Sequence, residues 1–205
     1  GELLGEHGGF VGHGLPMAPE NVYVPTVFIH PSLPRGVHAD TLIQHVDIYP
    51  TALNILTGNS GESDGEDLTE PVKEDRTAYS QAVLDPPSRF RDSIIDPVYD
   101  ARGAWTSNGG YVFLQNPRFV RAITAIYDAT RSGYTGAFNS NKNSAKVLST
   151  VISHYMKNML KYGKPSIGEA AALNLIDEIC SDGREPVAND ISDETKQQLE
   201  DLGYH

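Results

Sequence analysis

The sequence predicts an α/β fold, and three observations support this prediction. A glycine-rich stretch, residues 1–14, leads into Glu20–His30, a β-branched and aromatic segment typical of a buried strand. A helical pattern follows at residues 45–58. Beyond residue 76, short alternating segments and a glycine turn are typical of a small antiparallel sheet, and helical patterns close the chain.

The first fourteen residues contain six glycines and two histidines. Glycine accepts positive φ and lets the backbone approach a ligand closely, so we expect this stretch to be a ligand-binding loop. The alternative is a flexible N-terminal tail, because chain termini are often poorly ordered.

Strand and helix follow the loop in order. We expect Glu20–His30 to be a core strand entered through Pro25. In the next helix, Asp47 is expected to cap the N-terminus, Pro50 is tolerated in the first turn, and Gly58 is expected to end the helix. Loop, strand, crossing segment and helix together make an α/β unit.

The second half predicts a strand and a hairpin. Residues 76–84 alternate like a half-buried strand. Residues 101–106 and 111–114 flank the turn residues 107–110, and we expect Trp105 and Tyr111 to form a cross-strand pair.

Three helices are predicted to close the chain. An apolar stripe marks residues 144–160 as a helix, and a single histidine beside it, His154, is expected to be structural. Ser166 and Glu169 form a capping-box pattern ahead of a helix at residues 170–180, and Ser192 is expected to begin a terminal helix.

Three motifs resemble the sulfatases of the alkaline-phosphatase superfamily. They are the Gly-Glu-His-Gly loop at Gly5–Gly8, the Val24-Pro25 pair in the strand, and Val-Asp-Ile-Tyr-Pro-Thr at Val46–Thr51, in the order and spacing of that family. The end of the chain, Ser192–Tyr204, is also similar to the final helix of many microbial sulfatases.

The resemblance implies a division of the chain. Residues 1–60 would be the C-terminal part of an alkaline-phosphatase-like α/β/α sandwich that forms the catalytic core. Residues 61–75 would be an acidic linker, and residues 76–205 a small α+β subdomain with an antiparallel sheet and C-terminal helices.

The resemblance also implies a sulfuric ester hydrolase that uses a formylglycine nucleophile and a Ca²⁺ or Mg²⁺ ion. The nucleophile motif is missing, because the only cysteine, Cys180, is followed by Ser-Asp-Gly, which does not fit it. The metal-binding aspartates are expected just before Gly1, so none is predicted within the chain. We therefore expect a C-terminal portion of a larger enzyme that is inactive by itself.

Two histidines are the candidate substrate-binding residues. By resemblance, His13 is the first candidate for a sulfate contact and His7 the second; a solvent-facing role for His13 is the alternative. Four neighbours are expected to support the loop: Gly5, Glu6, Gly8 and Gly12.

Two other functions stay open at this point. A phosphonate or phosphodiester hydrolase of the same superfamily would keep the same loop and strand, and a degenerate sulfatase-like domain would serve as a non-catalytic scaffold. The identity of the small sulfate-ester substrate and the oligomeric state cannot be read from these residues.

Composition excludes some partners. The formal charge of −11, from 27 acidic and 16 basic residues, argues against nucleic acid and is consistent with adaptation to high salt. No apolar run reaches the roughly 18 residues that cross a bilayer, so no membrane partner is expected. A soluble protein is expected; the compartment stays open, with the cytoplasm favoured.

Overall fold

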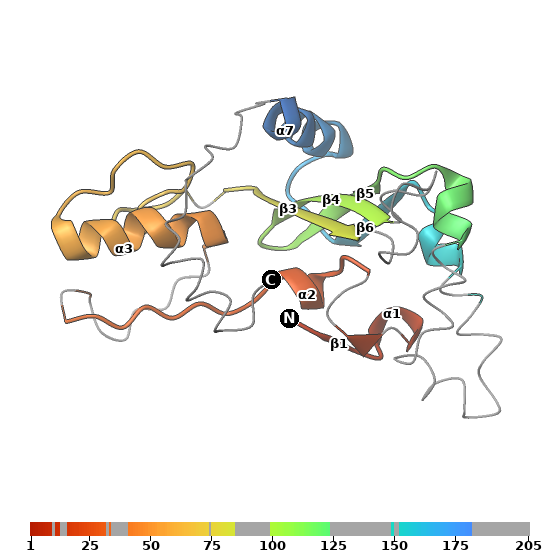
Figure 1. Cartoon of the computed structure of the whole chain (residues 1–205), viewed down its shortest axis with the longest axis horizontal. Helices are drawn as coiled ribbons and strands as arrows, with labels where there is room; N and C mark the ends of the chain where they lie inside the picture. Colours follow the sequence, from red (N-terminus) through yellow and green to blue (C-terminus); the bar gives the residue numbers. More distant parts are fainter. Residues whose placement is uncertain are drawn as a thin grey trace, which may run out of the picture.

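A four-stranded antiparallel sheet, in the order β3-β4-β5-β6, lies at the centre of the structure (Figure 1). Its strands are β3 (Ala78–Leu84), β4 (Tyr99–Thr106), β5 (Gly109–Leu114) and β6 (Met159–Gly163). Together with the helices described below, the sheet confirms the predicted α/β class.

The computed structural model describes most of the chain in several ranges. They are residues 1–9, 11–12, 16–31, 33, 41–73, 75–84, 99–123, 149 and 152–181.

The predicted strand at residues 76–84 and the predicted hairpin are confirmed, but the pairing of the hairpin differs. Trp105 lies opposite Gly110, and Ala104 lies opposite Tyr111. The predicted pair of Trp105 with Tyr111 is wrong, because a shift of one residue places these two side chains on opposite faces of the sheet.

The turn of the hairpin explains its register. The turn takes only residues 107–108, so that Thr106 pairs with Gly109. Gly109 has a φ of 143°, and a Cβ at this position would collide with the backbone of Tyr162. Only glycine fits there, which fixes where β5 begins.

The two faces of the sheet carry separate apolar clusters. On one face, α7 (Glu169–Ser181) packs Ala172 and Ile176 against Tyr111 and Phe113. The other face is covered by the N-terminal segment and by the helical turn at residues 152–155. In Figure 1, α7 lies above the sheet and the N-terminal segment below it. The buried cluster on the face covered by the N-terminal segment consists of Leu3, Met17, Ala18, Ala78, Tyr99, Ala101, Trp105, Val112, Leu114, Tyr155 and Leu160.

The N-terminal segment forms a small closed unit under the sheet. Strands β1 (Leu3–Leu4) and β2 (Val11–Gly12) pair with each other and enclose α1 (Glu6–Gly9). A further short helix, α2 (Pro19–Val22), follows. Leu3 is fully buried, so this unit is anchored in the core and the glycine-rich stretch is not a free tail.

The predicted core strand at Glu20–His30 is wrong in the structure. Its first residues belong to α2, and residues 23–30 have no regular secondary structure. Val27 and Ile29 are 77% and 92% exposed. Within the described ranges no strand pairs with this segment, and without a partner a β-branched sequence cannot satisfy its backbone as a strand.

The predicted helix after residue 45 is confirmed. It consists of a 3₁₀ turn, η1 (His45–Asp47), and the helix α3 (Ile48–Thr57). Gly58 ends α3 with a φ of 76°, as predicted. Asp47 stands at the N-cap position, but its side chain does not cap α3.

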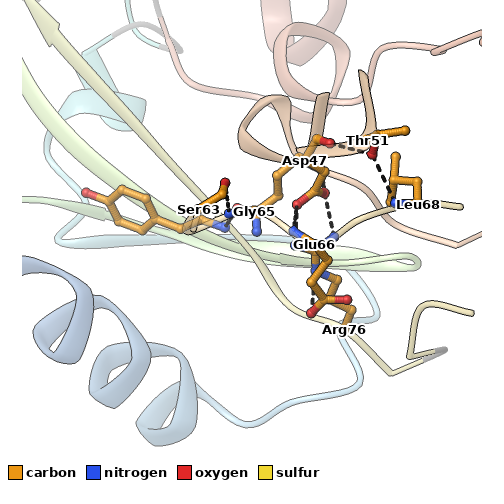
Figure 2. A network of polar contacts seen from close by, with 9 residues as sticks. Asp47, Thr51, Ser63, Gly65, Glu66, Leu68 and Arg76 are labelled. Carbon is orange, nitrogen blue, oxygen red and sulfur yellow. Dashed lines mark hydrogen bonds and ion pairs between the residues drawn. The ribbon is translucent and has the colours of Figure 1, made fainter. Parts of the chain in front are cut away.

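The Asp47 carboxylate instead joins three segments of the chain (Figure 2). It accepts two hydrogen bonds from the Arg76 guanidinium, of 2.5 and 2.8 Å, and one each from the backbone N–H groups of Gln44 and Glu66. Leu68 donates its backbone N–H to the Thr51 hydroxyl. Part of the predicted acidic linker is therefore tied to α3, while the domain boundaries themselves stay predictions.

The predicted helix at residues 144–160 is wrong at its C-terminal end. Residues 152–155 are helical, but Met159 and Leu160 belong to β6. The predicted helix at residues 170–180 is confirmed as α7, which begins at Glu169; Ser166 donates its backbone N–H to Thr106.

Two findings complete the fold. None of the helices in the described part of the chain is long and apolar enough to cross a bilayer. The predicted terminal helix from Ser192 lies outside the described residues.

Candidate functional site

The glycine-rich loop holds His7 in an uncommon backbone conformation. His7 has a φ of 53°, the only positive φ of a non-glycine residue in the described ranges, and Gly5 has a φ of 118°. The Glu6 carboxylate accepts the backbone N–H of Leu4, and this hydrogen bond lowers the pKa of Glu6. Backbone strain of this kind persists where the surrounding structure fixes it, and it is concentrated at functional sites.

The His7 side chain is fixed by two contacts. Its Nε2 lies 2.8 Å from Oε2 of Glu20 in α2. Its ring also lies edge-on to the Tyr162 ring, with centroids 5.3 Å apart. The Tyr162 hydroxyl donates to the Met17 carbonyl, and burial raises the pKa of Tyr162, so the phenol stays protonated and acts as a support.

A pocket of about 540 Å³ opens beside His7. It lies along β6, the edge strand of the sheet in the described part of the chain. Among the described residues, its walls carry two lysines, two histidines and two serines, and no acidic residue. The lining residues are His7, Ser149, Ser153, His154, Lys157, Met159, Leu160, Lys161 and Tyr162. In a chain with a charge of −11, this concentration of basic groups favours an anionic ligand.

Contacts of the described residues fix the backbone at Lys157 and place an aromatic ring beside Lys161. Arg121, which is 4% exposed, donates to the backbone carbonyl of Lys157 and to Oδ1 of Asn158, 2.8 Å away. Lys161 Nζ lies 5.5 Å from the centroid of the Tyr111 ring, within range of a cation–π interaction. Both lysine side chains are exposed, and the Lys161 side chain lies with Tyr111 on the face of the sheet that α7 covers.

His154 is a buried histidine in the same pocket. Burial lowers its pKa to about 4, and the nearby His7 and Lys157 add to this effect. At neutral pH it is therefore uncharged, which agrees with the predicted structural role. Its position in the pocket wall was not predicted from the sequence.

This lowered pKa predicts how stability depends on pH. In the unfolded chain His154 should titrate near 6.5, so between pH 6.5 and 4 the unfolded state binds a proton that the folded state does not. We expect the contribution of His154 to the free energy of unfolding to be fully present above pH 6.5 and to fall by about 3 kcal/mol as the pH approaches 4. Urea unfolding of the wild type and His154→Gln at several pH values measures this difference. Parallel pH profiles for the two proteins would contradict it.

The predicted site residues have different outcomes. His7, Gly5, Glu6 and Gly8 lie in or beside α1, and Gly12 pairs with Leu3 in the small two-stranded sheet. His13, the first candidate for substrate contact, lies outside the described residues, so its role stays a prediction.

The described part of the chain offers no ligand set for the Ca²⁺ or Mg²⁺ ion that the resemblance implies. Within those ranges no group of three or more histidine, cysteine, aspartate or glutamate side chains could hold a metal ion. The prediction of metal binding has no support within those ranges, and a Ca²⁺ or Mg²⁺ ion held by residues outside the chain stays a prediction.

The sequence analysis missed Glu20, Lys157, Lys161 and Tyr162. Lys157 falls within the predicted helix at residues 144–160, Lys161 falls just beyond it, and Glu20 begins the predicted strand. The available signal was the basic segment Lys157-Asn-Met-Leu-Lys161 in an acidic chain, since a lysine pair of this kind stands out against the overall charge.

Comparison with known proteins gives one curated relative. The whole chain is 32% identical, over 209 aligned residues, to a protein of Haloferax volcanii described as the low-salt glycan biosynthesis sulfotransferase Agl7. The chain spans about half the length of that relative. No protein-family model matches, and no solved structure matches.

This comparison overturns the predicted hydrolase. The relative is described as a sulfotransferase, which transfers a sulfuryl group, and not as a sulfatase. Membership of the sulfatase family and the alkaline-phosphatase-like fold are not confirmed. Its haloarchaeal source agrees with the adaptation to salt that the acidic composition suggests.

Proposed function

We propose that this chain forms part of an enzyme that transfers a sulfuryl group to a hydroxyl of a glycan, and that the pocket beside His7 binds the sulfuryl oxygens. The observation that carries the proposal is the similarity, along the entire chain, to a glycan biosynthesis sulfotransferase. The basic pocket gives that similarity a place where the chemistry could occur.

The charges in the pocket suit this reaction. As sulfur passes from the donor oxygen to the acceptor oxygen, negative charge is spread over the peripheral oxygens and builds up on the leaving oxygen. Hydrogen-bond donors that are held in place beforehand stabilise such charge without reorganising during the reaction. Lys157, Lys161 and the two serine hydroxyls of the wall supply N–H and O–H donors at this site.

A transfer assay tests the proposal. The full-length protein should move a labelled sulfuryl group from an activated donor, either an aryl sulfate ester or a sulfate–phosphate mixed anhydride, onto a glycan. Replacing both pocket lysines, as Lys157→Gln with Lys161→Gln, should lower kcat/KM on the order of 10²-fold, because preorganised donors are lost.

The control is Lys73→Gln, which removes one positive charge from an exposed position outside the pocket lining. This variant should transfer at the wild-type rate. Label that appears only as inorganic sulfate, with no sulfated glycan, would contradict the proposal.

A further inference from the structure

We propose that His7 and Glu20 form a catalytic dyad in which His7 accepts the proton of the glycan hydroxyl as that oxygen attacks sulfur. This inference rests on the proposed function, because it assigns the proton acceptor of the same transfer. It uses the contact between His7 Nε2 and Glu20 Oε2, at 2.8 Å, which joins α1 and α2.

The loop is built to aim the His7 ring. The paired strands β1 and β2 close both ends of the loop, and the His7 side chain contacts Glu20 of α2 and Tyr162 of β6. Tyr162 supports the ring from the edge. Tyr162 in turn stacks on the buried Trp105, with centroids 5.9 Å apart, so the support reaches the core of the sheet.

The side chains of the dyad are also open to solvent. They are 28% exposed for His7 and 34% for Glu20, and His7 lines the pocket. A substrate in the pocket can therefore reach the imidazole without any rearrangement of the core.

The carboxylate determines which ring nitrogen is free to act. The Glu20 carboxylate accepts a hydrogen bond from Nε2–H, which favours the tautomer with an unprotonated Nδ1. Nδ1 then has the lone pair that a general base needs, and the negative charge of Glu20 stabilises the imidazolium that forms.

The transfer step balances with this assignment. The acceptor oxygen forms a bond to sulfur while the bond from sulfur to the donor oxygen breaks. The proton of the acceptor hydroxyl passes to His7 Nδ1, and the donor oxygen leaves with the electron pair of the broken bond.

The other groups in the pocket fit this role less well. His154 is a poor base because burial lowers its pKa to about 4. Tyr162 is held as a phenol that donates to Met17. Lys157 and Lys161 are suited to the sulfuryl oxygens. Of the described lining residues, His7 alone combines an imidazole open to solvent with a carboxylate partner.

Kinetics of the full-length protein test the dyad. His7→Asn is the sharpest variant, since asparagine tolerates positive φ and so preserves the loop backbone. We expect kcat to fall by about 10²–10⁴-fold, the usual contribution of a general base, while KM for the donor and the Kd for inorganic sulfate stay within about twofold. The matched control is His45→Asn, which replaces an exposed histidine of η1 and should leave kcat unchanged.

Two variants of Glu20 separate the effect of its negative charge from its effect on the His7 tautomer. Glu20→Gln still offers an oxygen to Nε2, whereas Glu20→Ala offers none. ¹⁵N chemical shifts of His7 should show the Nε2-protonated tautomer in the wild type and in Glu20→Gln, and a mixture of tautomers in Glu20→Ala. The kcat of Glu20→Gln should lie between those of the wild type and Glu20→Ala.

The outcomes distinguish this inference from the proposed function. Wild-type kcat in His7→Asn, in a protein that transfers sulfuryl groups, would overturn the dyad and leave the transfer intact. A wild-type His7 ring protonated at Nδ1 would overturn the dyad whatever the activity. A wild type that transfers nothing from either donor class would overturn the proposed function, and the dyad with it.

Discussion

Asp47→Ala is expected to lower the free energy of unfolding by about 3–5 kcal/mol, because the buried Arg76 guanidinium loses its two short hydrogen bonds and keeps only the longer contact, 3.7 Å, to the exposed Glu66. Asp47 is fully buried and the Arg76 side chain is only 9% exposed. The variant also removes the acceptor for the N–H groups of Gln44 and Glu66. Three segments that meet at this carboxylate would lose their connection (Figure 2).

Urea unfolding measures this loss, and a paired variant tests its cause. Asp47→Leu combined with Arg76→Met replaces the ion pair by apolar side chains, so it should cost less than the sum of the two single variants. A loss below 1 kcal/mol for Asp47→Ala would show that the network does not hold these segments together.

The acid response of the same carboxylate has a defined sign. Burial opposes its ionisation, but the hydrogen bonds from Arg76 and the backbone outweigh burial and lower the pKa of Asp47. Its stabilisation is therefore present above the unfolded pKa and is lost as the pH falls through the lowered value.

Trp105→Ala is expected to have an effect of similar size, about 3–5 kcal/mol. Trp105 is 2% exposed, and its Nε1 donates to the Ser80 hydroxyl at 2.6 Å. The indole covers Gly103 and Gly110, where a Cβ would collide with it. Its removal would leave a cavity over both glycines and take away the ring on which Tyr162 stacks.

Far-UV circular dichroism is the appropriate probe, since Trp105 is the only tryptophan of the chain. Phe119→Ala is the control, because Phe119 is 55% exposed and its truncation should cost less than 1 kcal/mol. Equal losses for the two variants would contradict the account of the core around Trp105.

Local patterns predicted the elements whose partners are close in sequence. The hairpin, the strand at residues 76–84, α3 and α7 could be read from alternation, turn residues and helix ends. The register of the hairpin could not, because a two-residue turn and the three-residue turn that would pair Trp105 with Tyr111 share the same Ser-Asn-Gly-Gly sequence and differ by one residue in pairing.

Elements that depend on distant partners were predicted wrongly. The β-branched run after Glu20 looks like a core strand, but strand formation also requires a neighbouring strand to pair with. Met159 and Leu160 continue the apolar spacing of a helix, yet their pairing with β5 makes them a strand. Tertiary contacts decided both segments, and the local pattern does not contain them.

The site was predicted only in part for the same reason. His7 stood out because it lies in a motif, but its partner Glu20 is 13 residues away and Lys157 is far beyond. The fold brings these residues together along β6, a strand whose first two residues the sequence analysis assigned to a helix.

The most direct test of the central claim is to locate a sulfate analogue in the protein. Selenate has the shape and charge of sulfate, and its selenium atom can be identified by anomalous scattering in a crystal soaked with it. The account predicts a selenium peak in the pocket, within hydrogen-bond distance of Lys157 or Lys161 and beside His7. Selenium peaks confined to other surfaces, with the pocket empty at saturating selenate, would contradict it.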